Sequence, residues 1–132
     1  MGTAGIPASY GGFETLAEQL ARYNHDHNLN HQLTVYCSAE NIDRSSSPET
    51  FCSARLVYLP LKANGIASII YDGLSLIHAC FCRNRVDVIL ILGISGGIFL
   101  PLVRWFLGRC KLVLNPDGIE WQRQKWNSVA RA

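Results

Sequence analysis

The sequence has 132 residues, of which 48% are hydrophobic and 17% are charged. This composition predicts one globular domain and excludes a disordered chain. The formal net charge is only +2 at pH 7, which argues against a nucleic-acid-binding protein. The five cysteines are odd in number and their spacing matches no disulfide framework, so we expect reduced thiols in a cytosolic protein.

The chain opens with a glycine-rich loop, GTAGIPASYGG, at residues 2–12. The loop matches neither GxGxxG nor GxxxxGK[ST], so it predicts neither a dinucleotide fingerprint nor a P-loop. Gly11 and Gly12 directly precede a helix pattern. The free backbone N–H groups of a helix start suit a phosphate, and glycine lets a ligand approach the backbone closely. A plain turn is the alternative, and the pattern alone leaves both open.

The first helix is predicted from apolar residues at helical spacing, which form one stripe: Phe13, Leu16, Ala17, Leu20 and Ala21. Glu14 lies in the first turn, where the helix dipole favours a negative charge. Glu18 and Arg22 have the spacing of an ion pair. The helix ends in a polar loop, NHDHNLNH, whose histidines have no cysteine at zinc spacing, so we expect no metal site there.

Two strands follow, QLTVYC at about 32–37 and ARLVYLP at 54–60, with a polar loop between them. The next pattern predicts a helix at about 66–82. Its apolar face is expected to carry Ile66, Ile69, Ile70, Gly73, Leu74, Ile77 and Phe81. His78 in this helix is interpreted as a packed histidine with a backbone partner, in preference to a catalytic group.

The next strand, VDVILILG at 86–93, is apolar on both faces, as a central parallel strand is. A short helix at 98–108, a strand at 111–115, the turn NPDG and the start of a last helix complete the chain. The uncharged run at 88–103 is shorter than a membrane span and is broken by glycines. Insertion of this run into a membrane is the weaker alternative, and peripheral membrane contact stays open.

Strands that alternate with helices predict an α/β domain, a Rossmann-like parallel sheet with helices on both faces. Sheets of this kind bind ligands outside the carboxyl ends of their strands. The loops expected to gather there are the glycine loop, the loop after residue 37, KANG, GISGG and NPDG. Such a sheet also calls for a strand ahead of Gly2, so we expect the first strand to be missing.

Asp117 and Glu120 follow the last strand. A carboxylate at this end of the sheet can orient a hydroxyl or accept its proton. The same two residues have the spacing of a helix capping box. The two roles are compatible.

A family resemblance rests on GTAGIPASYGGFETLAEQL, LTVYC, RLVYLPLKANGIASIIYDGLSLIHA, LGISGG and NPDGIEWQRQKW. Together these segments resemble the amino-terminal domain of bacterial rhamnosyltransferase-like proteins, a domain first catalogued as one of unknown function. That domain is found in enzymes of glycosyltransferase family 4, which have the two-Rossmann-domain GT-B fold. The resemblance covers nearly the whole chain, and YGGFET and DGIEW-x-R-x-KW are its most specific signals.

The resemblance implies a retaining glycosyltransferase of the hexosyltransferase type. It would move a sugar, with rhamnose a candidate, from a nucleotide-sugar to a glycan or lipid-linked acceptor in cell-surface polysaccharide synthesis. The enzyme would need no metal or cofactor and would act in the cytoplasm, at the inner face of the cell membrane. Residues 1–132 would be its incomplete acceptor-side domain, inactive without the carboxyl domain that binds the donor.

The resemblance also implies site residues. Gly11 and Gly12 correspond to a loop that approaches the donor diphosphate in similar enzymes. The turn at 115–118 corresponds to a place where many relatives carry a histidine, whereas this chain has Asp117. We assign the catalytic positions to Asp117 and Glu120, and the substrate-binding positions to Gly11, Gly12, Phe13, Glu14, Ser95, Asn115 and Gly118. The alternative function is a non-catalytic Rossmann-like module that binds a nucleotide or a glycan.

Overall fold

A computed structural model describes residues 3–9, 11–39, 47–61, 67–81, 86–94, 97, 99–107 and 110–116. Its elements, in chain order, are α1 (Gly12–Asp26), β1 (Thr34–Ser38), β2 (Thr50–Phe51), β3 (Ala54–Leu59), α2 (Ala67–Phe81), β4 (Val88–Leu92), α3 (Leu100–Leu107) and β5 (Lys111–Asn115). The alternation of strands and helices confirms the predicted α/β fold, and it is consistent with a Rossmann-like arrangement.

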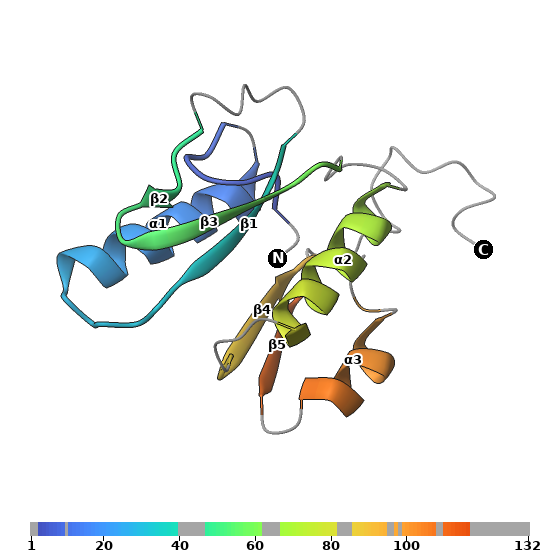
Figure 1. The fold of residues 1–132 in the computed structure, drawn as a ribbon. Coiled ribbons are helices and arrows are strands. Elements are labelled where there is room, and N and C mark those ends of the chain that lie inside the picture. The colour runs from blue at the N-terminus through green and yellow to red at the C-terminus, as the bar shows by residue number, and fades with distance from the viewer. Residues whose placement is uncertain are drawn as a thin grey trace.

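The described strands form two sheets, one with the order β1-β3-β2 and one that pairs β4 with β5 (Figure 1). The β1–β3 and β4–β5 pairs are parallel, as predicted. The antiparallel strand β2 lies in the segment expected to be a loop. It joins β3 through Cys52 and Ser53, both with positive φ. Two residues are too few to produce a periodic pattern, so no pattern of residues predicted this strand.

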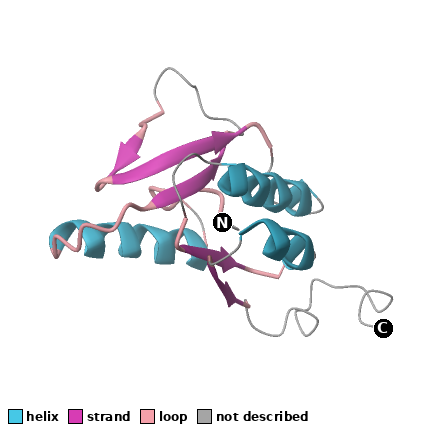
Figure 2. Cartoon of the chain, turned by 60° about the horizontal axis from the view of Figure 1, so that its bottom comes forward, coloured by secondary structure: helices cyan, strands magenta, loops and turns pink. Residues whose placement is uncertain are grey.

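Helices pack on both faces of the sheet that contains β1, as predicted. On one face, Ala21 of α1 shares a buried cluster with Cys37 of β1 and Leu56 of β3. On the other face, Tyr36 shares a cluster with Leu76 of α2 and with residues of β4. Tyr36 and Cys37 are neighbours in β1, and successive side chains of a strand point to opposite faces. Figure 2 shows the two groups of strands together with these helices.

The predicted apolar face of α2 is wrong, although the helix itself is present. Ile70, Leu74, Ile77 and Phe81 are exposed, and Phe81 keeps 79% of its surface. Of the predicted face, Gly73 is buried, and the rest of the buried side consists of Tyr71, Asp72, Ser75, Leu76 and Ala79. Small residues on that side allow close packing, because a Cβ on Gly73 would lie 2.9 Å from the ring of Phe99. Fit to the neighbouring elements therefore outweighed hydropathy in choosing the buried side.

The stripe predicted for α1 is only partly buried. Ala21 is fully buried, whereas Leu16 and Leu20 stay partly exposed. The buried side also carries the polar residues Glu14 and Asn24. The Asn24 amide donates to the His31 carbonyl oxygen at 3.0 Å, which fixes the loop that leads into β1.

Two smaller expectations have a clear outcome. The Glu18 and Arg22 side chains form the predicted pair, with an N–O distance of 2.8 Å. His78 packs edge-on against the Tyr36 ring, and its Nδ1 lies 2.9 Å from the Tyr36 hydroxyl. His78 is nevertheless exposed, so the structure does not confirm the packed histidine, and its described hydrogen-bond partner is a tyrosine hydroxyl where a backbone group was expected.

The uncharged run at 88–103 contains a strand and the start of a short helix. Its described residues include β4 and the first turn of α3, which is eight residues long. Across the described part of the chain, no helix has the length and apolar character needed to cross a bilayer. The four cysteines that the structure describes are free thiols: Cys37, Cys52, Cys80 and Cys110.

Candidate functional site

The glycine loop lies against the carboxyl end of β1. The Ser38 backbone N–H donates to the Ala4 carbonyl oxygen at 2.8 Å, and the Thr3 hydroxyl lies 3.4 Å from the Tyr36 carbonyl oxygen. Gly5 (φ +134°) sits directly on Cys37, since a Cβ there would lie 2.9 Å from the Cys37 Sγ. The glycine loop therefore lies at the carboxyl edge of the sheet, as the order of elements in the sequence predicted.

Two carboxylates of α1 hold the loop in place. Glu14 Oε1 accepts a hydrogen bond from the Ala4 N–H at 2.8 Å, and Glu18 Oε2 accepts one from the Ala8 N–H at 2.6 Å. The Ala8 N–H, and after it the Arg22 guanidinium, lower the pKa of the Glu18 carboxyl below its ordinary value. Glu14 is only 9% exposed. The carboxylate predicted to contact substrate thus binds its own loop.

The two glycines at the start of α1 differ in what they contribute to the fold. Gly11 has a φ of +106°, and a Cβ on it would collide with the Glu14 carboxylate, so the fold itself requires glycine there. A Cβ on Gly12 would meet nothing within 4 Å. Gly12 is exposed and belongs to the first turn of α1. Its backbone is therefore open to a ligand at the positive end of the helix dipole.

Three predicted segments meet beside these glycines. The Phe13 ring lies over Gly93, since a Cβ on Gly93 would be 3.5 Å from Phe13 Cε2. Gly93 in turn donates its N–H to the Asn115 carbonyl oxygen at 3.0 Å. The start of α1, the loop after β4 and the end of β5 therefore lie at one edge. Phe13 and Asn115 are 102 positions apart in the sequence, and Gly93 contacts both of them.

The other predicted site residues lie outside the described residues: Ser95, Asp117, Gly118 and Glu120. Their roles stay predictions. Asn115 and Pro116 are the described residues of that turn, and both are exposed. Gly93 and Glu18 were not among the predicted site residues. A glycine directly after a buried apolar strand was the available signal for Gly93, whereas the bond from Glu18 to Ala8 had none.

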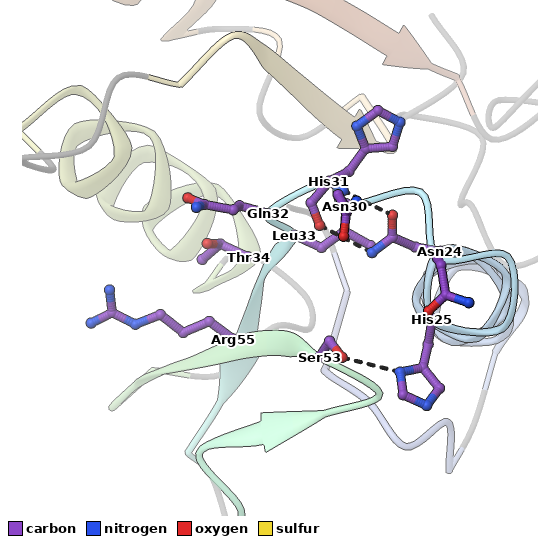
Figure 3. Close-up of a pocket in the computed structure, with 10 residues that line it drawn as sticks. Asn24, His25, Asn30, His31, Gln32, Leu33, Thr34, Ser53 and Arg55 are labelled. Atoms are coloured by element: carbon purple, nitrogen blue, oxygen red, sulfur yellow. Dashed lines mark hydrogen bonds between the residues drawn. The ribbon is translucent and has the colours of Figure 1, made fainter.

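A hollow of about 350 Å³ lies at the opposite end of the strands (Figure 3). It lies where β1 begins, between the end of α1 and the β2–β3 turn. Its polar groups largely satisfy one another: Asn24 binds the His31 backbone, and His25 Nδ1 lies 3.1 Å from the Ser53 hydroxyl. Arg55 points away from His25 in Figure 3. Parallel α/β sheets bind ligands at the carboxyl ends of their strands, so this hollow is the weaker candidate.

Comparisons with curated proteins and with solved structures give no match. A family model described as "Domain of unknown function (DUF1972)" matches residues 1–132. The match covers every element of the fold and all residues of the candidate site. The chain is thus a member of the DUF1972 family.

Proposed function

We propose that the chain is the acceptor-side domain of a retaining GT-B glycosyltransferase. The enzyme moves a sugar, with rhamnose a candidate, from a nucleotide-sugar to a glycan or lipid-linked acceptor in cell-surface polysaccharide synthesis. The observation that carries the proposal is the meeting of Phe13, Gly93 and Asn115 at one edge, beside the open backbone of Gly12. The resemblance described above supplies the reaction class.

The geometry supports a division of labour within the site. The exposed start of α1 offers N–H groups and a positive dipole end to the donor diphosphate, whose nucleotide is held by a carboxyl domain. Phe13 and Asn115 line the adjoining edge, where the acceptor is positioned. Asp117 and Glu120, which follow Asn115 in sequence, orient sugar hydroxyls or accept a proton. With a lipid-linked acceptor, the enzyme works at the cytoplasmic face of the membrane.

Gly12 provides the sharpest test, because its replacement is harmless to the fold. Gly12→Ala adds a methyl group where the fold has room, and alanine favours the helix. We expect this variant to keep its melting temperature and to bind a nucleoside diphosphate at least ~10-fold more weakly, the loss that about 1.4 kcal/mol of binding free energy produces. Amide chemical shifts in a titration with UDP and dTDP measure both the affinity and the site.

Ser53→Ala, in the hollow at the opposite end of the strands, is the matched control and should leave binding unchanged. Shifts confined to the hollow, or equal affinity of the Gly12→Ala variant and the parent chain, would contradict the proposal.

A second test places Asp117→Asn and Glu120→Gln at the matching positions of a two-domain relative. Unchanged transfer rates in both variants would remove these residues from the site. If the chain binds UDP or dTDP but two-domain relatives transfer no sugar, the result favours the non-catalytic binding module.

A further inference from the structure

The exposed side of α2 is apolar and carries no Asp, Glu, Lys or Arg. Its large apolar residues, called the α2 stripe below, are Ile70, Leu74, Ile77 and Phe81, and all four are exposed. The one such charged residue in α2 is Asp72, and it is buried. A helix at the surface of a monomer normally presents charged and polar residues to water. The α2 stripe therefore has the character of a contact surface.

The spacing of the α2 stripe is that of a surface on which a second helix packs. Its four residues recur at intervals of four, three and four positions, as the a and d positions of a coiled coil do. A stripe with this period stays on one side of a helix and interlocks with a stripe of the same spacing on a facing helix. The occupant that fits this surface is therefore an apolar helix with matching spacing.

The α2 stripe is complementary to itself. Ile70 and Phe81 lie equally far from the centre of the stripe, and so do Leu74 and Ile77. A second α2 that runs antiparallel about a two-fold axis at this centre therefore places its Phe81 opposite Ile70 and its Ile77 opposite Leu74. At each end of the contact the bulky aromatic ring meets a smaller aliphatic side chain, and two aliphatic pairs fill the centre. A second copy of the chain thus supplies a helix with the required spacing.

The charge of α2 favours a second copy over a membrane surface. Helices that lie on a bilayer carry Lys and Arg beside their apolar face, and α2 contains neither residue. When two copies of α2 pair, no exposed carboxylate, ammonium or guanidinium groups of these helices are brought together. The repulsion between like charges that opposes self-association is therefore absent along the helix.

The exposed area of the α2 stripe indicates how strong this pairing would be. The four side chains keep between 44% and 79% of their surface. At about 200 Å² for a large side chain, each copy offers roughly 450 Å², and a pair buries about 900 Å². Stable interfaces bury about 1,200–2,000 Å² in total, and smaller ones are weak and transient. We therefore expect a dissociation constant on the order of 100 μM, so that unfolding measured at a few μM reports the monomer.

We propose that the α2 stripe is the contact surface between two copies of this chain, with α2 packed antiparallel against α2 about a two-fold axis. The partner is thus the chain itself, and the dimer is a weak one that forms as the concentration rises. Gly12 belongs to α1, which lies on the opposite face of the sheet from α2. The pairing is therefore independent of the proposed function.

Sedimentation equilibrium of the full chain tests the pairing, over concentrations from about 5 to about 500 μM. We expect the average mass to rise from that of one chain toward that of two. Leu74→Glu should raise the dissociation constant at least ~100-fold, because each dimer would then bury two carboxylates. Leu20→Glu is the matched control and should leave the pairing unchanged, since Leu20 is 43% exposed, close to the 44% of Leu74, but lies on α1. Thermal unfolding of the dilute variants shows that both fold.

A mixing experiment tests the antiparallel register. Leu74→Glu and Ile77→Lys chains should each be monomeric alone and should pair when mixed, because position 74 of one copy then faces position 77 of the other and the opposite charges meet. A parallel pair would bring position 74 against position 74, so a mixture that stays monomeric would overturn the inference. A parent chain that is monomeric at the highest concentration would also overturn it, whether or not it binds phosphatidylglycerol vesicles. So would equal weakening of the dimer by Leu74→Glu and Leu20→Glu.

Discussion

The helices α1 and α2 have the same length and lie on opposite faces of the sheet, yet their polar and apolar side chains are distributed differently. α1 uses Glu14 and Glu18 to hold the glycine loop and pairs Glu18 with Arg22. α2 buries polar residues such as Asp72 and Ser75 and exposes a stripe of apolar ones. The difference teaches that the acidic side chains of α1 stabilise a loop, whereas α2 packs closely through small and polar residues and leaves an apolar stripe exposed.

Two leucines of α2 give the largest expected effect. Leu76 is fully buried, whereas Leu74 is 44% exposed on the apolar stripe. We expect Leu76→Ala to lower the free energy of unfolding by about 3 kcal/mol and Leu74→Ala by less than ~1 kcal/mol, because only the first leaves a cavity. Urea denaturation of both variants measures this. Similar losses in the two variants would mean that the stripe is buried after all.

The two glycines at the start of α1 come next. Gly11→Ala should lower the free energy of unfolding by about 1–3 kcal/mol, because alanine is strained at this φ and its methyl group meets Glu14. Gly12→Ala should cost nothing or stabilise slightly. Thermal unfolding of the pair measures the difference. If both variants were equally stable, the Glu14 carboxylate would not be fixed against the loop.

Two buried tyrosines on the α2 side of the sheet differ in the hydrogen bonding of their hydroxyl groups. Tyr36→Phe removes the bond to His78 and should cost about 1 kcal/mol, whereas Tyr71→Phe removes a buried hydroxyl without a described partner and should be neutral or stabilising. Urea denaturation again compares the two variants. A clear loss in Tyr71→Phe would show that its hydroxyl is paired.

The smallest effect concerns the titration of Glu18. Its pKa is lowered from the ordinary 4.5, first by the Ala8 N–H and then by Arg22. A carboxyl with a lowered folded pKa stabilises the fold above its unfolded pKa, and this contribution is lost as the pH falls through the folded value. Arg22→Gln should raise the pKa only part of the way, since the Ala8 bond remains. Carboxyl carbon shifts measured between pH 2 and about 6 follow this. Full return to 4.5 would mean that the Ala8 bond is absent in solution.

The existence and order of the long elements could be predicted because periodicity is a local property of the sequence. The stripe from Phe13 to Ala21 and the apolar run at 86–93 both gave the right element. The buried side of α2 could not be predicted, because the helix is apolar on several sides and Gly73 was matched to Phe99 only in three dimensions. The strand β2 was missed because two residues carry no period.

The candidate site shows the same limit. Its place at the carboxyl edge followed from the strand order, and the exposure of Gly12 fits the predicted helix start. The bond from Glu14 to Ala4 was not predictable, since a first-turn glutamate is also what the helix dipole favours. The contact between Phe13 and Gly93 depends on where the start of α1 lies relative to the end of β4, which no local pattern encodes.

Gly5 of the glycine loop packs directly against Cys37, so the reactivity of this thiol can report motion of the loop. Cys37 is 1% exposed, and burial raises the pKa of its thiol. A maleimide or iodoacetamide can therefore reach this sulfur only when the loop lifts away. The half-buried thiol of Cys52, which the glycine loop does not cover with a glycine contact of this kind, supplies a reference rate. Alkylation kinetics at Cys37 thus report how often the glycine loop opens, and a ligand that clamps the loop should slow them.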